Sequence, residues 1–195
     1  MHGHIRLKGE WHPFEAEQVL RWDRGFVWKA TVKMNGLPVV GSDRWVNGEA
    51  AMRWNLLGLF PVARGGGPQI ARSAAGRFNA ESLFLPTALL DGGVRWLEGD
   101  PSHAGAVVKA HGEESRIELT IAQSGAVREC RVVRWGDPDG RGFRYVDFGG
   151  VIEEERCFGG LTVPSSLRLG WFYGTDRFTR EGEFFRATVD EVEYR

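Results

Sequence analysis

The chain has few cysteines, no long apolar run and no excess of charge. Its 195 residues include two cysteines, Cys130 and Cys157, which form neither a disulfide framework nor a metal-ligand spacing, so we expect two reduced thiols. No stretch of about 18 apolar residues occurs, which excludes a transmembrane helix. No apolar signal-peptide region follows Met1, so the chain as it stands predicts a cytoplasmic location. The sequence starts almost directly on a predicted strand. If the natural chain has an upstream segment, that segment could carry a signal for a different location.

The balance of charge argues against a nucleic-acid partner. There are 25 basic and 26 acidic residues, and the net charge is −1, so no strong field would steer the chain to a polyanion. The hydrophobic fraction of 42% and charged fraction of 26% are typical of a globular protein. This length is ordinary for one β-rich domain, and we expect a single domain over 1–195.

Recognisable catalytic and metal motifs are also absent. There is no HExxH, no GxSxG and no phosphate-binding GxxxxGK[ST], and the run Gly65-Gly66-Gly67 has no lysine after it. His2 and His4 share a face of one strand, but no third ligand accompanies them. We therefore expect no bound metal and no cofactor.

What the chain does contain is a regular alternation of apolar and polar residues. Residues 26–34 place Phe26, Trp28 and other apolar side chains on one face, and 116–121 alternate in the same way, which is typical of antiparallel sheet with one buried face. Asn35-Gly36 and Asn47-Gly48 are two-residue hairpin signals. About a dozen such strands exceed a comfortable flat sheet. The fold class we expect is mainly β: a strongly curved antiparallel sheet, a half-barrel or open barrel, with further strands at 4–8, 14–22, 37–46, 50–60, 94–98, 105–110, 127–135, 142–147, 151–158, 166–173 and 184–194.

One segment, at about 68–90, breaks this pattern and predicts a helical insertion against the concave face. Pro68 suits a first helical turn, and Ile70, Ala74 and Phe78 recur at helical spacing. Pro86 predicts a break into two short helices. The preceding run 56–62 is apolar on both faces, so we expect it to be covered on both sides or to lie under the insertion.

Aromatic side chains on the predicted sheet and on the helical insertion suggest an apolar cavity between them. Two explanations stay open: these residues simply fill a core, or they enclose a ligand. For the second, the candidate apolar contacts are Trp28, Trp54, Phe78, Phe84, Trp96, Trp171 and Tyr173. Glu154 and Arg156, on one face of a predicted strand, would supply a polar anchor, with Asp176 and Arg177 in a turn at the rim.

Three functions are compatible with this pattern. The first is a non-enzymatic module that binds a hydrophobic or amphiphilic small molecule between sheet and helix. The second is an enzyme that uses carboxylates and arginine in the same cleft, through Glu154, Arg156, Asp176 or Asp190. The third is an interaction domain with a packed interior and no ligand. The missing nucleophile–base pair favours the first.

The motifs also carry a resemblance to a family. The segments MRWNLLGLFPV (52–62), RSAAGRFNAESLFLPTALL (72–90), RWGDPDG (134–140) and EEERCFGGLTVPSSLRLGW (153–171), with GTDR…GEFFR (174–186), resemble a family of bacterial proteins of unknown function. The resemblance covers nearly the whole chain but assigns no role to any residue. More remotely, the chain resembles half-barrel lipoprotein carriers and sensors of the bacterial envelope, which implies a lipid-type cavity by analogy of fold alone. Those proteins are exported, whereas this chain shows no export signal.

Overall fold

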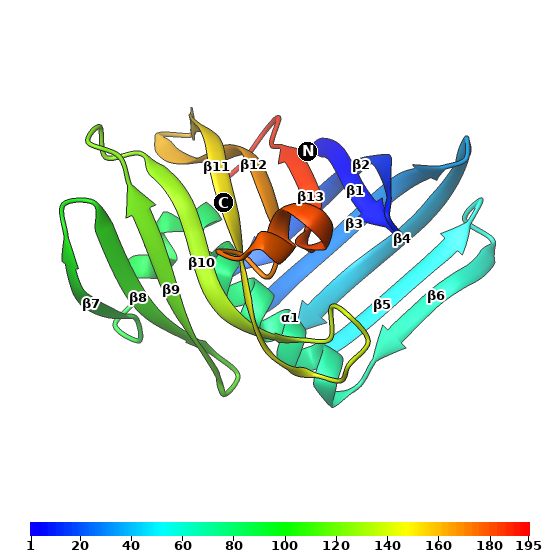
Figure 1. The fold of residues 1–195 in the computed structure, drawn as a ribbon, viewed down its shortest axis with the longest axis horizontal. Coiled ribbons are helices and arrows are strands. Elements are labelled where there is room, and N and C mark those ends of the chain that lie inside the picture. The colour runs from blue at the N-terminus through cyan, green and yellow to red at the C-terminus, as the bar shows by residue number, and fades with distance from the viewer.

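The computed structural model describes residues 1–195, which form one antiparallel sheet of 13 strands (Figure 1). The sheet is strongly curved and remains open, so the predicted fold class is confirmed. The strands are β1 (His2–Leu7), β2 (Glu10–Arg21), β3 (Gly25–Met34), β4 (Leu37–Val46), β5 (Glu49–Leu56), β6 (Phe60–Gly66), β7 (Arg95–Asp100), β8 (His103–Ala110), β9 (Glu113–Ile121), β10 (Val127–Gly136), β11 (Arg144–Phe158), β12 (Leu161–Trp171) and β13 (Glu183–Thr188).

The order of strands places the two ends of the chain in the middle of the sheet. The order is β6-β5-β4-β3-β2-β1-β13-β12-β11-β10-β9-β8-β7, so β6 and β7 are the free edges. Every pair except one joins strands that follow each other in the sequence. The exception is β1 with β13, where Gly3 lies opposite Ala187 and Ile5 opposite Phe185. Two wings, one from each half of the chain, therefore meet along a single central pairing (Figure 1).

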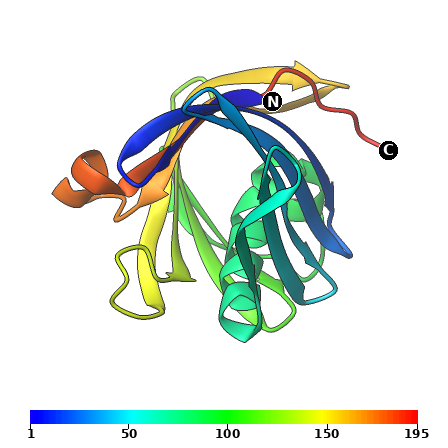
Figure 2. The same cartoon turned by 90° about the vertical axis from the view of Figure 1, so that its right-hand side faces the viewer.

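The helical insertion is confirmed and connects the two edge strands. It consists of α1 (Pro68–Ala80) and the 3₁₀ turns η1 (Glu81–Phe84) and η2 (Pro86–Leu90), with the predicted break at Leu85. A short π-helical turn, η3 (Phe178–Gly182), precedes β13. Helix α1 contacts β3–β6 on one wing and β8–β10 on the other, and Figure 2 shows the sheet arching around it. The insertion thus bridges the open side of the curved sheet.

Polar contacts hold α1 on the wing that contains β9. Asn79 is fully buried and donates from its amide to the carbonyl oxygen of Glu113 (3.1 Å) and to Ser115 Oγ (2.9 Å). The buried Glu113 carboxylate pairs with Arg72 at 2.8 Å and accepts a hydrogen bond from the Tyr145 hydroxyl at 2.8 Å. Because both oxygens of the Glu113 carboxylate are partnered, its burial does not leave an unpaired charge beneath the helix.

Glycine explains how the sheet can bend so strongly where β11 and β12 pair. Gly149 lies opposite Gly170, and Gly150 lies opposite Leu169. A Cβ added at Gly150 would overlap the carbonyl oxygen of Arg168, and one added at Gly170 would overlap that of Gly182. The neighbouring backbones approach so closely that no side chain fits between them, which permits a sharp local coil.

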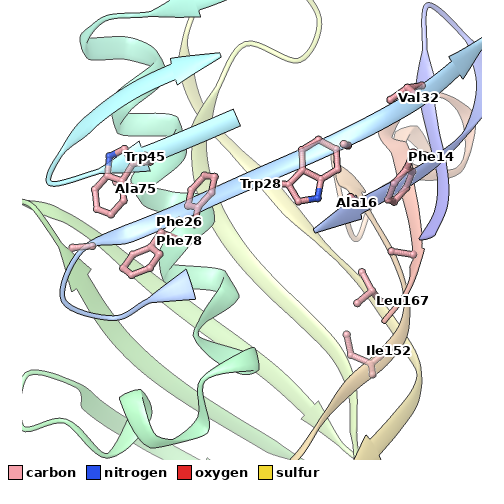
Figure 3. Close-up of a cluster of buried hydrophobic side chains, with 13 residues drawn as sticks. Phe14, Ala16, Phe26, Trp28, Val32, Trp45, Ala75, Phe78, Ile152 and Leu167 are labelled. Atoms are coloured by element: carbon pink, nitrogen blue, oxygen red, sulfur yellow. The ribbon is translucent and has the colours of Figure 1, made fainter. Parts of the chain in front are cut away.

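The core fills the space between sheet and helix. Phe26 and Trp45, which are 2% and 1% exposed, face Ala75 and Phe78 of α1, and the same cluster continues along β3 to Trp28 (Figure 3). The ring centroids of Trp45 and Phe78 lie 5.1 Å apart. A smaller second cluster joins β8, β9 and β10 through Ala106, Val108, Ile117, Leu119 and Cys130.

The two predicted Asn-Gly hairpin turns of the first wing, the strands β1–β6, are confirmed, and other two-residue turns went unpredicted. Asn35-Gly36 and Asn47-Gly48 have positive φ at both positions, as a type I′ turn requires. Lys8-Gly9 and His111-Gly112 also have positive φ at both positions. Lys and His lack the intrinsic preference of Asn for the left-handed region, so these turns carried a weaker signal.

Three element expectations were wrong. The run 56–62 is a hairpin tip between β5 and β6, and Leu59 and Phe60 are 76% and 61% exposed, because α1 packs near the other end of this hairpin, at Met52 and Gly65. Ranges 142–147 and 151–158 belong to one strand, since Gly149-Gly150 bends β11 without interrupting its pairing. The last strand ends at Thr188, so 189–194 lies outside the sheet.

The two thiols differ in environment and should differ in reactivity. Cys130 is buried, and burial raises its pKa to about 12, whereas Cys157 is exposed. Cys130 lies opposite Gly150, and Cys157 lies seven positions further along β11, about 20 Å away, which is beyond disulfide reach. We expect iodoacetamide at pH 8 to label the native protein once, at Cys157, and the denatured protein twice, as counted by intact-mass spectrometry. Labelling of Cys130 and Cys157 at equal rates in the native protein would contradict the burial of Cys130.

Candidate functional site

A large cavity lies between the concave face of the sheet and the helical insertion. Its volume is about 1440 Å³, and 24 of its 43 lining residues are hydrophobic, so most of the wall offers no hydrogen bonds. Strands from both wings contribute to the wall, together with α1 and η1. The cavity spans the central β1–β13 pairing as well. The cavity therefore lies along the concave face of both wings.

Some of the predicted apolar contacts lie in this cavity. Trp28, Phe84 and Trp171 all line it, from β3, η1 and β12 respectively. Trp54 does not line the cavity: its ring packs against Trp28 at 5.7 Å between centroids, and its Nε1 donates to Asp43 at 3.0 Å. Sheet and insertion thus bring together aromatic groups that are far apart in the sequence.

Other predicted apolar contacts lie elsewhere. Phe78 is 3% exposed and is packed between Trp22 and Trp45 in the core. Trp96 is 49% exposed on the edge strand β7, and its Nε1 donates to the carbonyl oxygen of Leu89. Tyr173 packs against Phe178 outside the cavity, and burial raises its pKa to about 12.

The expected polar anchor lies on the outside of the sheet. Glu154 and Arg156 are exposed and pair loosely with each other at 3.9 Å, and neither lines the cavity. Ile152 does line it, and regular alternation would have placed Glu154 beside it. The pairing of β11 with β12 shifts register on both sides of Glu154, so a bulge changes which face each later side chain occupies.

The rim turn is likewise separate from the cavity. Asp176 is exposed, and Arg177 pairs with Glu181 and, at 3.1 Å, with Asp139. The guanidinium of Arg177 lies 3.6 Å from the centroid of the Phe172 ring. Arg144, followed by Arg177, holds the pKa of Asp139 well below its usual range. These contacts describe a structural ion-pair network on the outer surface.

Several polar groups of the cavity wall form a bonded cluster around Arg77 of α1. Arg77 donates from Nε to Glu81 at 2.6 Å and from Nη2 to the side-chain oxygen of Gln18 at 2.8 Å. Gln18 in turn donates to the second carboxylate oxygen of Glu81 at 3.1 Å. The Asp43 carboxylate lies 3.9 Å from Arg77 and accepts the Trp54 hydrogen bond. Both carboxylates are thus engaged by protein donors.

Arg134 of β10 is the exception among these groups. Its Nε donates to the Ser73 carbonyl oxygen at 3.0 Å, and its Nη2 approaches Ser73 Oγ at 3.4 Å, but no carboxylate pairs with it. Its guanidinium lies 4.8 Å from the centroid of Phe148 and 5.0 Å from that of Trp171. Burial and, after it, the like charge of Arg77 lower the pKa of Arg134 to about 9. The side chain lines the cavity and keeps part of its surface open to it.

Sequence reasoning missed this cluster, although two signals were present. Arg77 follows Ile70 by seven residues and Ala74 by three, which places it on the apolar face of the helix. Arg134 follows Cys130 and Val132 at the period of a strand, so it shares their buried face. A charged residue on an otherwise apolar face was the signal in both cases.

Two further findings concern metal ligands and membrane-crossing helices. The His, Cys, Asp and Glu side chains form no group of three or more that could hold a metal ion, and His2 instead contacts Asp190 at 3.0 Å. No helix of the structure combines the length and the apolar character that crossing a membrane requires.

The fold and cavity together define a curved-sheet protein whose open side is bridged by a helix. Comparison with protein families then gives the family: the chain belongs to the "Family of unknown function (DUF6920)", whose model matches residues 1–194. Searches of curated proteins and of solved structures returned no match. The remote resemblance to half-barrel lipoprotein carriers therefore stays an analogy of fold.

Proposed function

We propose that this protein is a non-enzymatic module that binds a hydrophobic or amphiphilic small molecule between the curved sheet and the helical insertion. The observation that carries the proposal is the cavity of about 1440 Å³ with its mainly hydrophobic wall. Ligand pockets usually measure about 300–1,000 Å³, so the space is ample for a small molecule. A packed interaction domain would leave only small voids in its interior, so a cavity of this size favours ligand binding.

The polar groups in the cavity favour binding over catalysis. A catalytic carboxylate would need access to a substrate proton, whereas Glu81 is bonded to Arg77 and Gln18, and Asp43 is bonded to Trp54. The groups first considered for catalysis, Glu154, Arg156 and Asp176, are exposed outside the cavity. Asp190 does lie at the cavity wall, but it is engaged by His2.

A neutral hydrophobic dye tests the proposal without involving charge. N-phenyl-1-naphthylamine becomes fluorescent in apolar surroundings, and we expect saturable binding to the wild-type protein with displacement by 1-dodecanol. Leu169 lines the cavity from β12, so Leu169→Trp should fill part of the space and weaken dye binding about fivefold or more. Val133→Trp is the matched control, because Val133 is 48% exposed on the outer face. Absence of saturable binding by the wild type, or equal weakening by both variants, would contradict the proposal.

A further inference from the structure

The strongest unexplained feature of the cavity is the guanidinium of Arg134. Arginine presents five N–H donors, and Ser73 accepts from only two of the three nitrogen atoms. Nη1 makes no hydrogen bond within the protein, although the side chain lines the cavity. A cation enclosed by protein is costly unless an anion or several acceptors compensate its lost hydration.

The local carboxylates do not supply that compensation directly. Glu81 and Asp43 act on Arg134 only from a distance, and their hydrogen bonds go to Arg77, Gln18 and Trp54. Arg77 is a second positive charge that disfavours the charged form of Arg134. The immediate neighbours of the Arg134 head are the rings of Phe148 and Trp171 and the backbone of α1 at Ser73.

The wall next to Arg134 is apolar along the strands. On β10, Val132 and Cys130 share the face of Arg134, and they lie opposite Phe148 and Gly150. On β11 and β12 the lining continues with Ile152 and Leu167, which lie opposite each other. Val146, the partner of Arg134, and Ile152 are six positions apart, or about 20 Å of strand. A cation at one end of an apolar wall is suited to a molecule with a charged head and an alkyl body.

We infer that the cavity selects amphiphiles with an anionic head group, a carboxylate or a phosphate monoester, and that Arg134 is the residue that binds this head. The inference rests on the proposed function and narrows it to a ligand class. The guanidinium fork matches the two oxygens of such a head, and charge-assisted hydrogen bonds are stronger than neutral ones. Asp43 and Glu81 keep Arg77 occupied, which leaves Arg134 as the arginine of the cavity wall without a carboxylate partner.

The test compares three ligands that share one alkyl chain. Isothermal titration calorimetry at pH 7.5 is run with dodecanoate, 1-dodecanol and dodecyltrimethylammonium, below their micelle concentrations. We expect dodecanoate to bind the wild type more tightly than dodecyltrimethylammonium. In Arg134→Met, the affinity of dodecanoate relative to that of 1-dodecanol should fall about tenfold or more, while 1-dodecanol still binds. Arg134→Lys should give a smaller loss, because lysine keeps the charge but not the fork.

Arg156→Met is the matched control. It removes the same charge from an exposed position that the sequence alone had suggested as the anchor. It should leave the affinity of dodecanoate relative to that of 1-dodecanol unchanged. If all three ligands bind but the ratio in Arg134→Met equals that of the wild type, the inference is wrong and the proposed function stands. If none binds, the proposed function fails and the inference with it. Should Arg134→Met not fold, as judged by circular dichroism, dodecyltrimethylammonium binding to the wild type as tightly as dodecanoate overturns the inference.

Discussion

Replacing Phe78 by alanine is expected to lower the free energy of unfolding by about 3–5 kcal/mol. The ring is 3% exposed and lies between Trp22 and Trp45, at centroid distances of 5.6 Å and 5.1 Å. Its removal leaves a cavity where α1 meets the first wing and deletes two aromatic contacts. Urea denaturation followed by circular dichroism measures the loss, with the slope of the transition checked for a change in the unfolded state.

Phe84→Ala is the matched control for this prediction. Phe84 lies six residues further along the insertion, is only partly buried and lines the large cavity. We expect a smaller loss of stability, about 1–2 kcal/mol, together with weaker binding of N-phenyl-1-naphthylamine. Equal losses of stability in the two variants would contradict the assignment of Phe78 to the core and of Phe84 to the cavity wall.

Gly150→Ala should be the most damaging single-methyl change in the sheet, with an expected loss of about 3 kcal/mol. The added Cβ would overlap the carbonyl oxygen of Arg168 on the neighbouring strand, and a backbone atom cannot rotate away as a side chain could. The pairing of β11 with β12 would have to separate where Gly150 lies opposite Leu169. Thermal and urea unfolding measure the effect.

The control for the glycine variant is Gly92→Ala. A methyl group added at Gly92 would have no atom within 4 Å, and the φ angle there is not positive. Alanine at this position should therefore change the stability by less than about 0.5 kcal/mol. A Gly150→Ala protein as stable as the Gly92→Ala protein would mean that β11 and β12 do not approach each other closely.

The sequence predicted the type of fold because its signals are local. Alternation in 26–34 and the Asn-Gly pairs at 35–36 and 47–48 specify strands and hairpins within a few residues. Pro68 and the spacing of Ile70, Ala74 and Phe78 specify a helix in the same way. An excess of strands over what a flat sheet holds then implies curvature.

The site was predicted less well because it depends on features that local patterns do not contain. A register shift next to Glu154 reverses the faces of the side chains beyond it, and this shift arises from the pairing of β11 with β12. Alternation places Arg134 on the face of Cys130 and Val132, but it does not show that α1 supplies the Ser73 carbonyl oxygen as an acceptor for a charge on that face. Phe78 was assigned to the ligand for a related reason: helical spacing identifies an apolar face but not what that face contacts.

The single pairing of β1 with β13 has a consequence for how the chain reaches its final form. All other strand pairs form between consecutive segments of the chain. Each wing can therefore form by successive local pairings, each with a small entropy cost of loop closure. The β1–β13 pair joins residues such as His4 and Arg186 and must close nearly the whole chain at once. We therefore expect this pairing to form last, after both wings exist. Until it forms, the inner faces of the wings expose Trp28 and Phe148 to water, and at that stage the chain is most vulnerable to aggregation.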